Sequence, residues 1–391
     1  MNNGRMLLFL LSFGHLATDM VQGALPALLP YLKDCFDLSY TVTGSILLAA
    51  HLTSSVIQPL FGFLTDRRPF PILLSLGCLV SGIGIALIPF APSFSWLIAF
   101  VMFMGLGTAA FHPEGFKATA CIVSLKRATG MSFFSVGGNL GFAIGAPAAI
   151  FLVARYGLPG AAALFLPAAA AAALFLPALP RIRERIAAVA ARPPSHVENG
   201  VRHPMYAVSL IVLIVVFRSW TQLGLAAFLP FLYREELATN PGFVATLLFL
   251  FLGAGTVGTL AGGPIADRIG HRRMLFYSLS LQIPLIFLFL AARGWTVFVL
   301  AAAVGATIVS TFSVTIVMAQ ELFPRRMATA SGAIAGFAIG TGGIGVTLLG
   351  AVADRYGVPA AVHLINLLPA FGALLAAMLP IPWKAGLARP A

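Results

Sequence analysis

The segment "GPIADRIGHRR", Gly263 to Arg273, repeats the pattern of the segment "GFLTDRR", Gly62 to Arg68, which lies about 200 residues earlier. Each segment joins two long apolar runs. Chance could produce one such match, but a set of matches in register over most of the chain indicates an internal duplication. Further matches occur at the same offset: "AFLPFL" (227–232) with "ALLPYL" (27–32), and "RYGVP" (355–359) with "RYGLP" (155–159).

The composition excludes a water-soluble protein, because 59% of the 391 residues are hydrophobic and only 9% are charged. The apolar runs are long and do not alternate with polar residues, which excludes a membrane β-barrel. We therefore predict an all-α membrane protein with twelve spans, each of about 20 residues. The expected spans are 6–30, 40–64, 70–90, 95–119, 127–153, 159–179, 205–232, 243–266, 273–292, 295–320, 327–351 and 358–380.

The basic residues predict the orientation, because Lys and Arg are retained on the cytoplasmic side. The N-terminal side of the expected spans carries 18 of them, and the opposite side carries five. Both termini should therefore be cytoplasmic, in a multi-pass protein of the cell (inner) membrane. This asymmetry accounts for the net charge of +12 without nucleic-acid binding.

The longest polar interruption, Arg181 to His203, falls between the sixth and seventh spans. It predicts a six-helix bundle at 1–180, a cytoplasmic linker at 181–204 and a second six-helix bundle at 205–391. Six is an even number, so the two copies are parallel repeats. The basic amphipathic stretch "RIRERIAAVAARPP" could lie on the membrane surface or act as a flexible tether.

The duplicated segment, with the pattern G-x-x-x-D-R-x-G-x-[RK]-[RK] between the second and third helices of each half, resembles the gating motif of the major facilitator superfamily. The second copy has the whole pattern, whereas the first continues as "RPFP", so the gate could be weaker there. The gating residues that the resemblance implies are Gly62, Asp66, Arg67, Gly263, Asp267 and Arg268.

Four other segments are similar to the fosmidomycin resistance protein group of that superfamily: "GHLATDMVQGALPALLPYLKDCFDLSY", "SSVIQPLFGFLTDRR", "FHPEGFKA" and "FRSW". The resemblance implies a proton-driven exporter of drugs. It also implies a substrate cavity at mid-membrane, lined by the first, fourth, seventh and tenth spans, around which the two halves rock.

The first span carries three polar residues on one helix face, because His15, Asp19 and Gln22 are four and three residues apart. Asp19 lies near mid-span, where an ionisable group is costly unless it faces water or a partner. It could be a buried carboxylate satisfied by neighbours such as Gln22. Alternatively, it faces the cavity, where it takes up and releases a proton, with His15 in the same pathway, or contacts the substrate.

The seventh span carries Arg218 near mid-depth, with Trp220 and Gln222 close by. Arginine stays protonated and is therefore a fixed positive charge. The repeat pairs Arg218 with Thr18, next to Asp19, so the two charges could face each other. One interpretation is an ion pair that locks the halves. The other is a substrate site in which Arg218 binds phosphonate, phosphate or carboxylate oxygens, with Gln22, Trp220 and Gln222 beside it.

The segment "FHPEGFK", Phe111 to Lys117, places His112 and Glu114 towards the cytoplasmic end of the fourth span, where Pro113 loosens the helix. A carboxylate beside a histidine is a candidate proton carrier. Glu114 and Lys117 are also three residues apart, so an intrahelical ion pair is an alternative.

Glycines at four-residue spacing mark two further spans: Gly137, Gly141 and Gly145 in the fifth, and Gly332, Gly336 and Gly340 in the eleventh. They predict close helix packing, and the first set resembles the antiporter signature of drug exporters. The stripe of His51, Ser55 and Gln58 in the second span predicts hydrogen bonds between helices more than substrate contact.

Other classes of function find little support in the sequence. An intramembrane enzyme would need a nucleophile with its base or a metal site, and neither H-E-x-x-H nor G-x-S-x-G occurs. We expect no metal and no cofactor beyond the proton gradient, and a monomer is sufficient. A channel or receptor would not require Asp19, Glu114 and Arg218 together. Within transport, a proton symporter that imports an organic anion is the alternative to an exporter.

Overall fold

The computed structural model describes residues 3–38, 40–123, 126–191, 203–233 and 241–380. Within these ranges the secondary structure is helical throughout, because a backbone that crosses a bilayer must satisfy its own hydrogen bonds. The predicted twelve spans are confirmed. They are 4–29, 45–67, 72–90, 94–122, 127–156, 158–190, 204–229, 246–269, 271–291, 296–322, 327–353 and 358–378.

The chain forms two compact units. Unit 1 comprises 1–125, 133–193 and 324–336, and unit 2 comprises 126–132, 194–323 and 337–391. Each unit thus takes one short segment at the start of a helix from the other half of the sequence. The predicted bundles at 1–180 and 205–391 stay a prediction, and residues 192–202 of the predicted linker lie outside the described residues.

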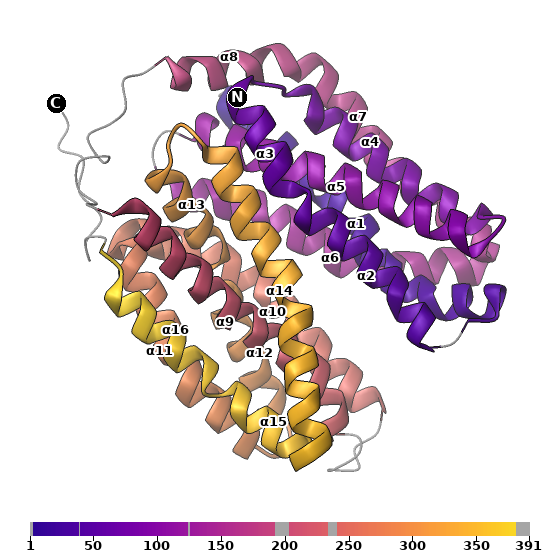
Figure 1. Ribbon diagram of the computed structural model, residues 1–391, viewed down its shortest axis with the longest axis vertical. Helices are drawn as coiled ribbons and strands as arrows, with labels where there is room; N and C mark the ends of the chain where they lie inside the picture. The colour runs from indigo at the N-terminus through magenta and orange to yellow at the C-terminus, as the bar shows by residue number, and fades with distance from the viewer. Residues whose placement is uncertain (1–2, 39, 124–125, 192–202, 234–240, 381–391) are drawn as a thin grey trace. The chain divides into compact units, whose positions relative to one another are not determined.

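Unit 1 is built around α5, which packs against α1, α2, α3 and α4 (Figure 1). Its elements are α1 (Asn3–Phe36), α2 (Tyr40–Val56), α3 (Gln58–Arg67), α4 (Ile72–Leu87), η1 (Ile88–Phe90), α5 (Phe94–Ile122), α6 (Arg127–Tyr156) from residue 133, η2 (Leu158–Leu164), α7 (Phe165–Phe175), η3 (Leu176–Ala178), α8 (Leu179–Ala190) and the first residues of α14 (Met327–Tyr356).

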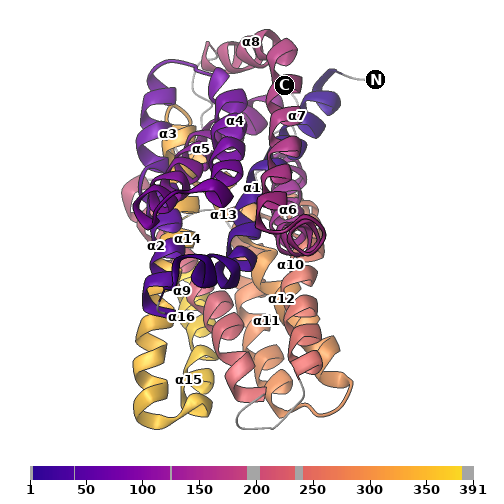
Figure 2. The same ribbon diagram turned by 90° about the vertical axis from the view of Figure 1, so that its right-hand side faces the viewer.

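Unit 2 is built around two helix pairs, α10 with α12 and α9 with α16, while α11 packs against both α12 and α16 (Figure 2). Its elements are the start of α6, α9 (Pro204–Phe231), α10 (Pro241–Ile269), α11 (His271–Ala291), α12 (Thr296–Val309), α13 (Phe312–Leu322), the rest of α14, α15 (Val358–Ile365) and α16 (Leu368–Met378).

Each unit has its own apolar core. In unit 1 the core includes Leu25, Leu28 and Met104, and in unit 2 it includes Phe251 and Phe289. Large apolar side chains such as Phe9 and Phe249 are more than 70% exposed. Exposed apolar side chains are expected on helices whose outer faces contact lipid and not water.

The predicted glycine stripe of α6 lies directly against α1. A methyl group added at Gly137, Gly141 or Gly145 would collide with the backbone carbonyl groups of Ser12, Leu16 and Met20, respectively. The stripe therefore sets the close approach of the two helices, and the prediction of close packing is confirmed. Gly332 and Gly336 of α14 pack in the same way against the backbone of Gln58 and Ser55.

The basic stretch that starts at Arg181 forms most of helix α8, which lies across the ends of the unit 1 helices (Figure 1). Ile182 and Ile186 are buried, one turn apart, while Arg181, Arg183 and Arg185 are exposed. The apolar face thus packs on unit 1. Residues 179–190 form an amphipathic helix and not a flexible tether.

Candidate functional site

Asp19 of α1 lies between two histidines, with its side chain 16% exposed. Asp19 Oδ1 is 3.0 Å from His112 Nε2, and Asp19 Oδ2 is 3.2 Å from His15 Nε2. Gln22 Nε2 donates a hydrogen bond to Asp19 Oδ1 at 3.2 Å. The structure thus brings together four residues that the sequence singled out, three from one face of α1 and one from α5. We call His15, Asp19 and His112 the carboxylate–histidine cluster.

The second ring nitrogen of His15 fixes where its protons lie. His15 Nδ1 is 2.8 Å from the Phe134 carbonyl oxygen, which can only accept, so Nδ1 carries a hydrogen. In a neutral imidazole the other nitrogen, Nε2, then carries only a lone pair, and this lone pair faces the Asp19 carboxylate. The contact becomes a hydrogen bond only when one further proton sits on His15 Nε2 or on Asp19 Oδ2.

Aromatic rings and a glycine enclose the cluster. The His15 ring stacks on Phe134, with centroids 4.2 Å apart, and meets Phe116 edge on at 6.0 Å. A methyl group at Gly138 would lie 2.6 Å from Asp19 Oδ2 and would also collide with His15 Nε2. The absence of a side chain at Gly138, a position the sequence reasoning missed, therefore leaves room for the cluster.

The cluster is compact enough for its members to share one cation, because His15, Asp19 and His112 each offer an atom within 4.8 Å of the others. His112 Nδ1 is buried and has no hydrogen-bond partner among the residues that the structure describes. The two histidines are therefore not equivalent. A backbone carbonyl holds His15, whereas only the carboxylate holds His112.

Glu114 is fully buried in α5, and the intrahelical ion pair with Lys117, the alternative interpretation of this segment, does not form. Lys117 Nζ donates to the Thr65 carbonyl at 2.6 Å and lies 3.5 Å from Asp66 Oδ1. The nearby Thr65 hydroxyl donates instead to the Gly62 carbonyl. Within the described ranges, neither carboxylate oxygen of Glu114 has a hydrogen-bond partner.

Further buried side chains, in α2 and α3, carry polar groups without a partner among the described residues. Both amide atoms of Gln58 and the hydroxyl of Ser55 are buried without a partner in the described part of the chain. The sequence predicted that this stripe makes hydrogen bonds between helices, and the structure does not contain them for these atoms. Buried polar groups of this kind commonly bind ordered water.

Unit 2 holds a buried cation, because the side chain of Arg218 in α9 is enclosed by protein. Its Nη1 donates to Gln222 Oε1 at 3.4 Å, and its guanidinium carbon lies 5.4 Å from the centre of the Phe312 ring. No described atom accepts a hydrogen bond from Arg218 Nε. The guanidinium thus retains an unused donor at Nε.

Trp220, a further predicted substrate residue of α9, packs against α14. Trp220 Nε1 donates to the Thr341 carbonyl at 2.9 Å, and a methyl group at Gly345 would lie 2.6 Å from the Trp220 ring. Trp220 therefore fixes α9 against α14. Asp19 lies in unit 1 and Arg218 in unit 2, so the idea that they face each other stays a prediction.

The first copy of the gating motif holds the start of α14. Asp66 Oδ1 accepts from Ala328 N at 3.1 Å, and Asp66 Oδ2 accepts from Thr329 N at 2.8 Å and Thr329 Oγ1 at 2.7 Å. These amides lie in the first helical turn, which has no intrahelical acceptors and carries the positive end of the helix dipole. A methyl group at Gly62 would lie 2.7 Å from the Ala328 carbonyl carbon.

The second copy makes the same contacts with the start of α6. Asp267 accepts from Ala128 N at 3.2 Å, from Thr129 N at 2.8 Å and from Thr129 Oγ1 at 2.5 Å. A methyl group at Gly263 would lie 2.7 Å from the Ala128 carbonyl carbon. The capping contact therefore exists in both copies, although the first copy lacks the distal half of the motif. Arg67 and Arg268 are both exposed.

The groups that accompany the two capping carboxylates differ. Lys117 accompanies Asp66, whereas His271 lies between two acids in unit 2: its Nε2 is 3.8 Å from Asp267 Oδ1 and its Nδ1 is 3.2 Å from Glu321 Oε2. Sequence reasoning missed both His271 and Glu321. The basic residue His271, four residues after the motif Asp, was the available signal.

Comparison with known proteins agrees with this architecture. The sequence pattern of the Major Facilitator Superfamily matches residues 11–232 and 208–387. The chain is 32% identical to the uncharacterized MFS-type transporter YfnC of Bacillus subtilis over 383 residues, 97% of this chain and 93% of YfnC.

It is 30% identical to the fosmidomycin resistance protein of Escherichia coli (strain K12) over 367 residues, 93% of this chain and 90% of that protein. The fold is similar to the crystal structure of the human organic anion transporter MFSD10, with a TM-score of 0.71 and 18% identity over 96% of this chain and 100% of that chain. The predicted fold and the resemblance to the fosmidomycin resistance group are thereby confirmed.

Proposed function

Because the chain belongs to the major facilitator superfamily, whose members are membrane transporters of small molecules and not enzymes, we propose that it is a proton-coupled antiporter. It exports fosmidomycin-like or other anionic small molecules by alternating access, as a monomer in the cell (inner) membrane with both termini in the cytoplasm. The basic residues that favour one side of the spans and the name of its Escherichia coli relative support the orientation and the substrate class.

The observation that carries the proposal is the contact between His15 and Asp19. The Phe134 carbonyl accepts the hydrogen of His15 Nδ1, so the 3.2 Å contact between His15 Nε2 and Asp19 Oδ2 is a hydrogen bond only when one more proton is bound. That proton is the coupled ion. Loss of the proton leaves a lone pair facing a carboxylate, which favours rearrangement of α1 against α5 and α6.

Glu114 takes the next position in the proton pathway. It lies in α5, two residues after His112, and its two oxygens are unpaired among the described residues. Ordered water held by Glu114 and Gln58 would connect the capping region at Asp66 with the cluster. Protons would then reach Asp19 along α5 from the side of the gating motif.

Arg218 binds the anionic group of the substrate. Its guanidinium is buried, is always protonated, and is held by a neutral partner, Gln222, at 3.4 Å. A phosphonate or carboxylate would supply the missing acceptors for its remaining N–H groups. Gln222 positions the guanidinium and Gln22 positions Asp19, while Trp220 supports the site through its packing on α14.

The alternative is a proton symporter that imports an organic anion. The same proton site and the same guanidinium serve either direction, because coupling depends on the order in which proton and substrate bind. The direction of proton movement during transport separates the two.

The test uses purified protein in proteoliposomes with an imposed pH gradient and an internal fluorescent pH reporter. Fosmidomycin and simple phosphonates are added to wild type, Asp19→Asn, Glu114→Gln and Arg218→Ala. Arg155→Ala is the matched control, because it removes an exposed charge of unit 1 and leaves the titratable groups of the site in place.

We expect substrate-driven proton movement in wild type, loss of it in Asp19→Asn, slower movement in Glu114→Gln, and retention of coupling in Arg155→Ala. Proton movement against the direction of substrate movement identifies an antiporter. Undiminished coupling in a folded Asp19→Asn protein would rule out the cluster as the proton site.

A further inference from the structure

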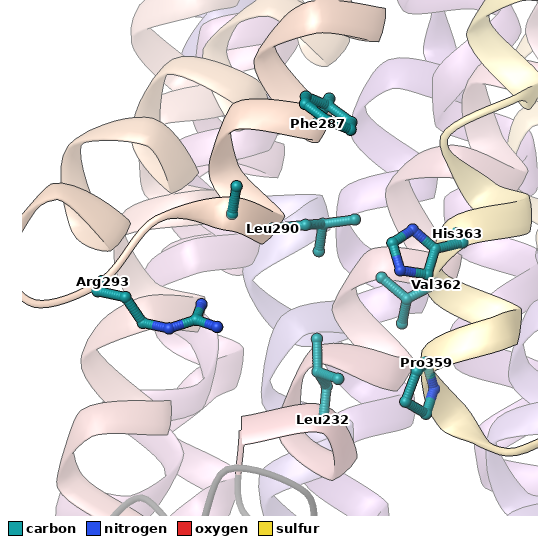
Figure 3. Close-up of a pocket in the computed structure, with 8 residues that line it drawn as sticks. Leu232, Phe287, Leu290, Arg293, Pro359, Val362 and His363 are labelled. Carbon is teal, nitrogen blue, oxygen red and sulfur yellow. The ribbon is translucent and has the colours of Figure 1, made fainter.

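A cavity lies in unit 2, and none of its lining residues belongs to the polar sites described above. Its volume is about 230 Å³, and it lies where the ends of α9 and α11 meet α15. Figure 3 shows its walls, with Phe287 and Leu290 from α11 on one side and Val362 from α15 on the other. The cavity lies at the C-terminal end of α11, whereas the second copy of the gating motif lies at the N-terminal end of the same helix.

The walls of the cavity continue into the apolar surface of a span. The α11 span ends at Ala291, and Phe287, one turn before that end, is 62% exposed. Trp295 follows shortly after the span and is 73% exposed, which is typical of an aromatic residue at a membrane interface. The cavity therefore lies at the level where acyl chains meet headgroups.

Two basic side chains enter the cavity from opposite sides, Arg293 from the segment between α11 and α12 and His363 from α15 (Figure 3). Its eight lining residues, all within the described part of the chain, include no acidic side chain. Burial raises the pKa of the Tyr233 phenol, although nearby Arg293 opposes this shift. Tyr233 therefore adds no negative charge beside Arg293.

We propose that this cavity binds one anionic phospholipid. Arg293 and His363 hold the phosphodiester, and an acyl chain lies along Phe287, Leu290 and Val362. The occupant is a lipid and not a free anion, because most of the lining is apolar and continues into the surface of the span. A zwitterionic lipid fits less well, because its cationic headgroup would add positive charge to a cavity that already holds a guanidinium.

This site is independent of the proposed transport activity, so its test needs no substrate. The purified full chain is exchanged into nanodiscs of phosphatidylglycerol and phosphatidylcholine in equal amounts, released into mild detergent, and analysed by native mass spectrometry for retained lipid. Arg293→Ala, His363→Ala and the double variant are compared with wild type. The matched control is Arg155→Ala, an exposed arginine of unit 1 that stacks over Tyr156 at 5.6 Å.

We expect wild type to retain phosphatidylglycerol in preference to phosphatidylcholine, and each variant to lower that preference by about fivefold, while Arg155→Ala leaves it unchanged. Glycerophosphoglycerol, the same headgroup without acyl chains, should not displace the lipid. Equal retention of both lipids in wild type, or an unchanged preference in the folded double variant, would overturn the proposal. Displacement by the free headgroup would show an anion site without lipid selectivity and would also overturn it.

Discussion

At the scale of single residues, the two copies of the repeat place opposite charges beside equivalent glutamines. Gln22 donates to Asp19 three residues before it, whereas Gln222 accepts from Arg218 four residues before it. The two glutamines are equivalent under the 200-residue repeat. One neutral side chain type thus positions an acid in one copy and a base in the other, because an amide group both donates and accepts.

Gly138 provides the most direct test of the cluster geometry. Gly138→Ala places a methyl group against His15 and Asp19, and overpacking of this kind costs about 1–3 kcal/mol. We expect proton movement in proteoliposomes to fall by about tenfold or more. Gly253→Ala, whose methyl group would meet no atom within 4 Å, is the control and should retain activity. Full coupling in Gly138→Ala would mean that the cluster tolerates a different arrangement.

Arg218→Lys tests the role of the guanidinium as an anion receptor. Lysine retains the charge but loses the planar fork, and a charge-assisted hydrogen bond contributes about 1.5–3 kcal/mol. Titration calorimetry should therefore show phosphonate binding weakened by about tenfold or more. Arg155→Ala should bind as wild type does. Equal affinity in Arg218→Lys would indicate that the substrate binds elsewhere.

At the scale of helices, glycines and capping carboxylates determine how the elements meet. The stripe of α6 lets α1 approach closely enough for the Phe134 carbonyl to reach His15. Asp66 and Asp267 bind the first turns of α14 and α6. In both cases one helix supplies what the backbone of another lacks, either space or an acceptor.

The two capping contacts should have similar energies, because their distances are nearly the same. Asp66→Asn and Asp267→Asn each retain one carbonyl oxygen but lose the negative charge at a helix N-terminus, so each should destabilise the protein by about 1 kcal/mol. Thermal unfolding in detergent measures the change, with the exposed Asp34→Asn of α1 as control. An unchanged midpoint for either variant would show that its capping contact contributes nothing.

At the scale of the whole molecule, the proposed proton site and the proposed anion site belong to different units. Asp19 with its histidines lies in unit 1, and Arg218 with Gln222 lies in unit 2. Substrate binding and proton binding should therefore be separable by mutation. Coupling between them would arise from the short starts of α6 and α14, each of which belongs to the unit opposite to the rest of its helix.

Separability gives a prediction for the whole transporter. Arg218→Ala should lose phosphonate binding by calorimetry but still take up a proton, as measured by the pH change when detergent-solubilised protein is moved between lightly buffered solutions. Asp19→Asn should bind phosphonate but take up no proton. Loss of both functions in either folded variant would show that the two sites act as a single site.

The sequence by itself determined the twelve spans, the duplication, the family and the residues with unusual chemistry, because each of these depends on local composition or on periodicity along the chain. It also placed His15, Asp19 and Gln22 on one face, since that relation needs only the geometry of a single helix.

Only the tertiary structure decided which partners these residues take. Lys117 could pair with Glu114 within its own helix, yet it binds Thr65 and Asp66 of α3. The Phe134 carbonyl and the space at Gly138 belong to a helix more than 100 residues away from Asp19. Contacts of this kind depend on which helices meet. The glycine stripe of α6 predicts a close approach, but the sequence does not tell which helix lies against it.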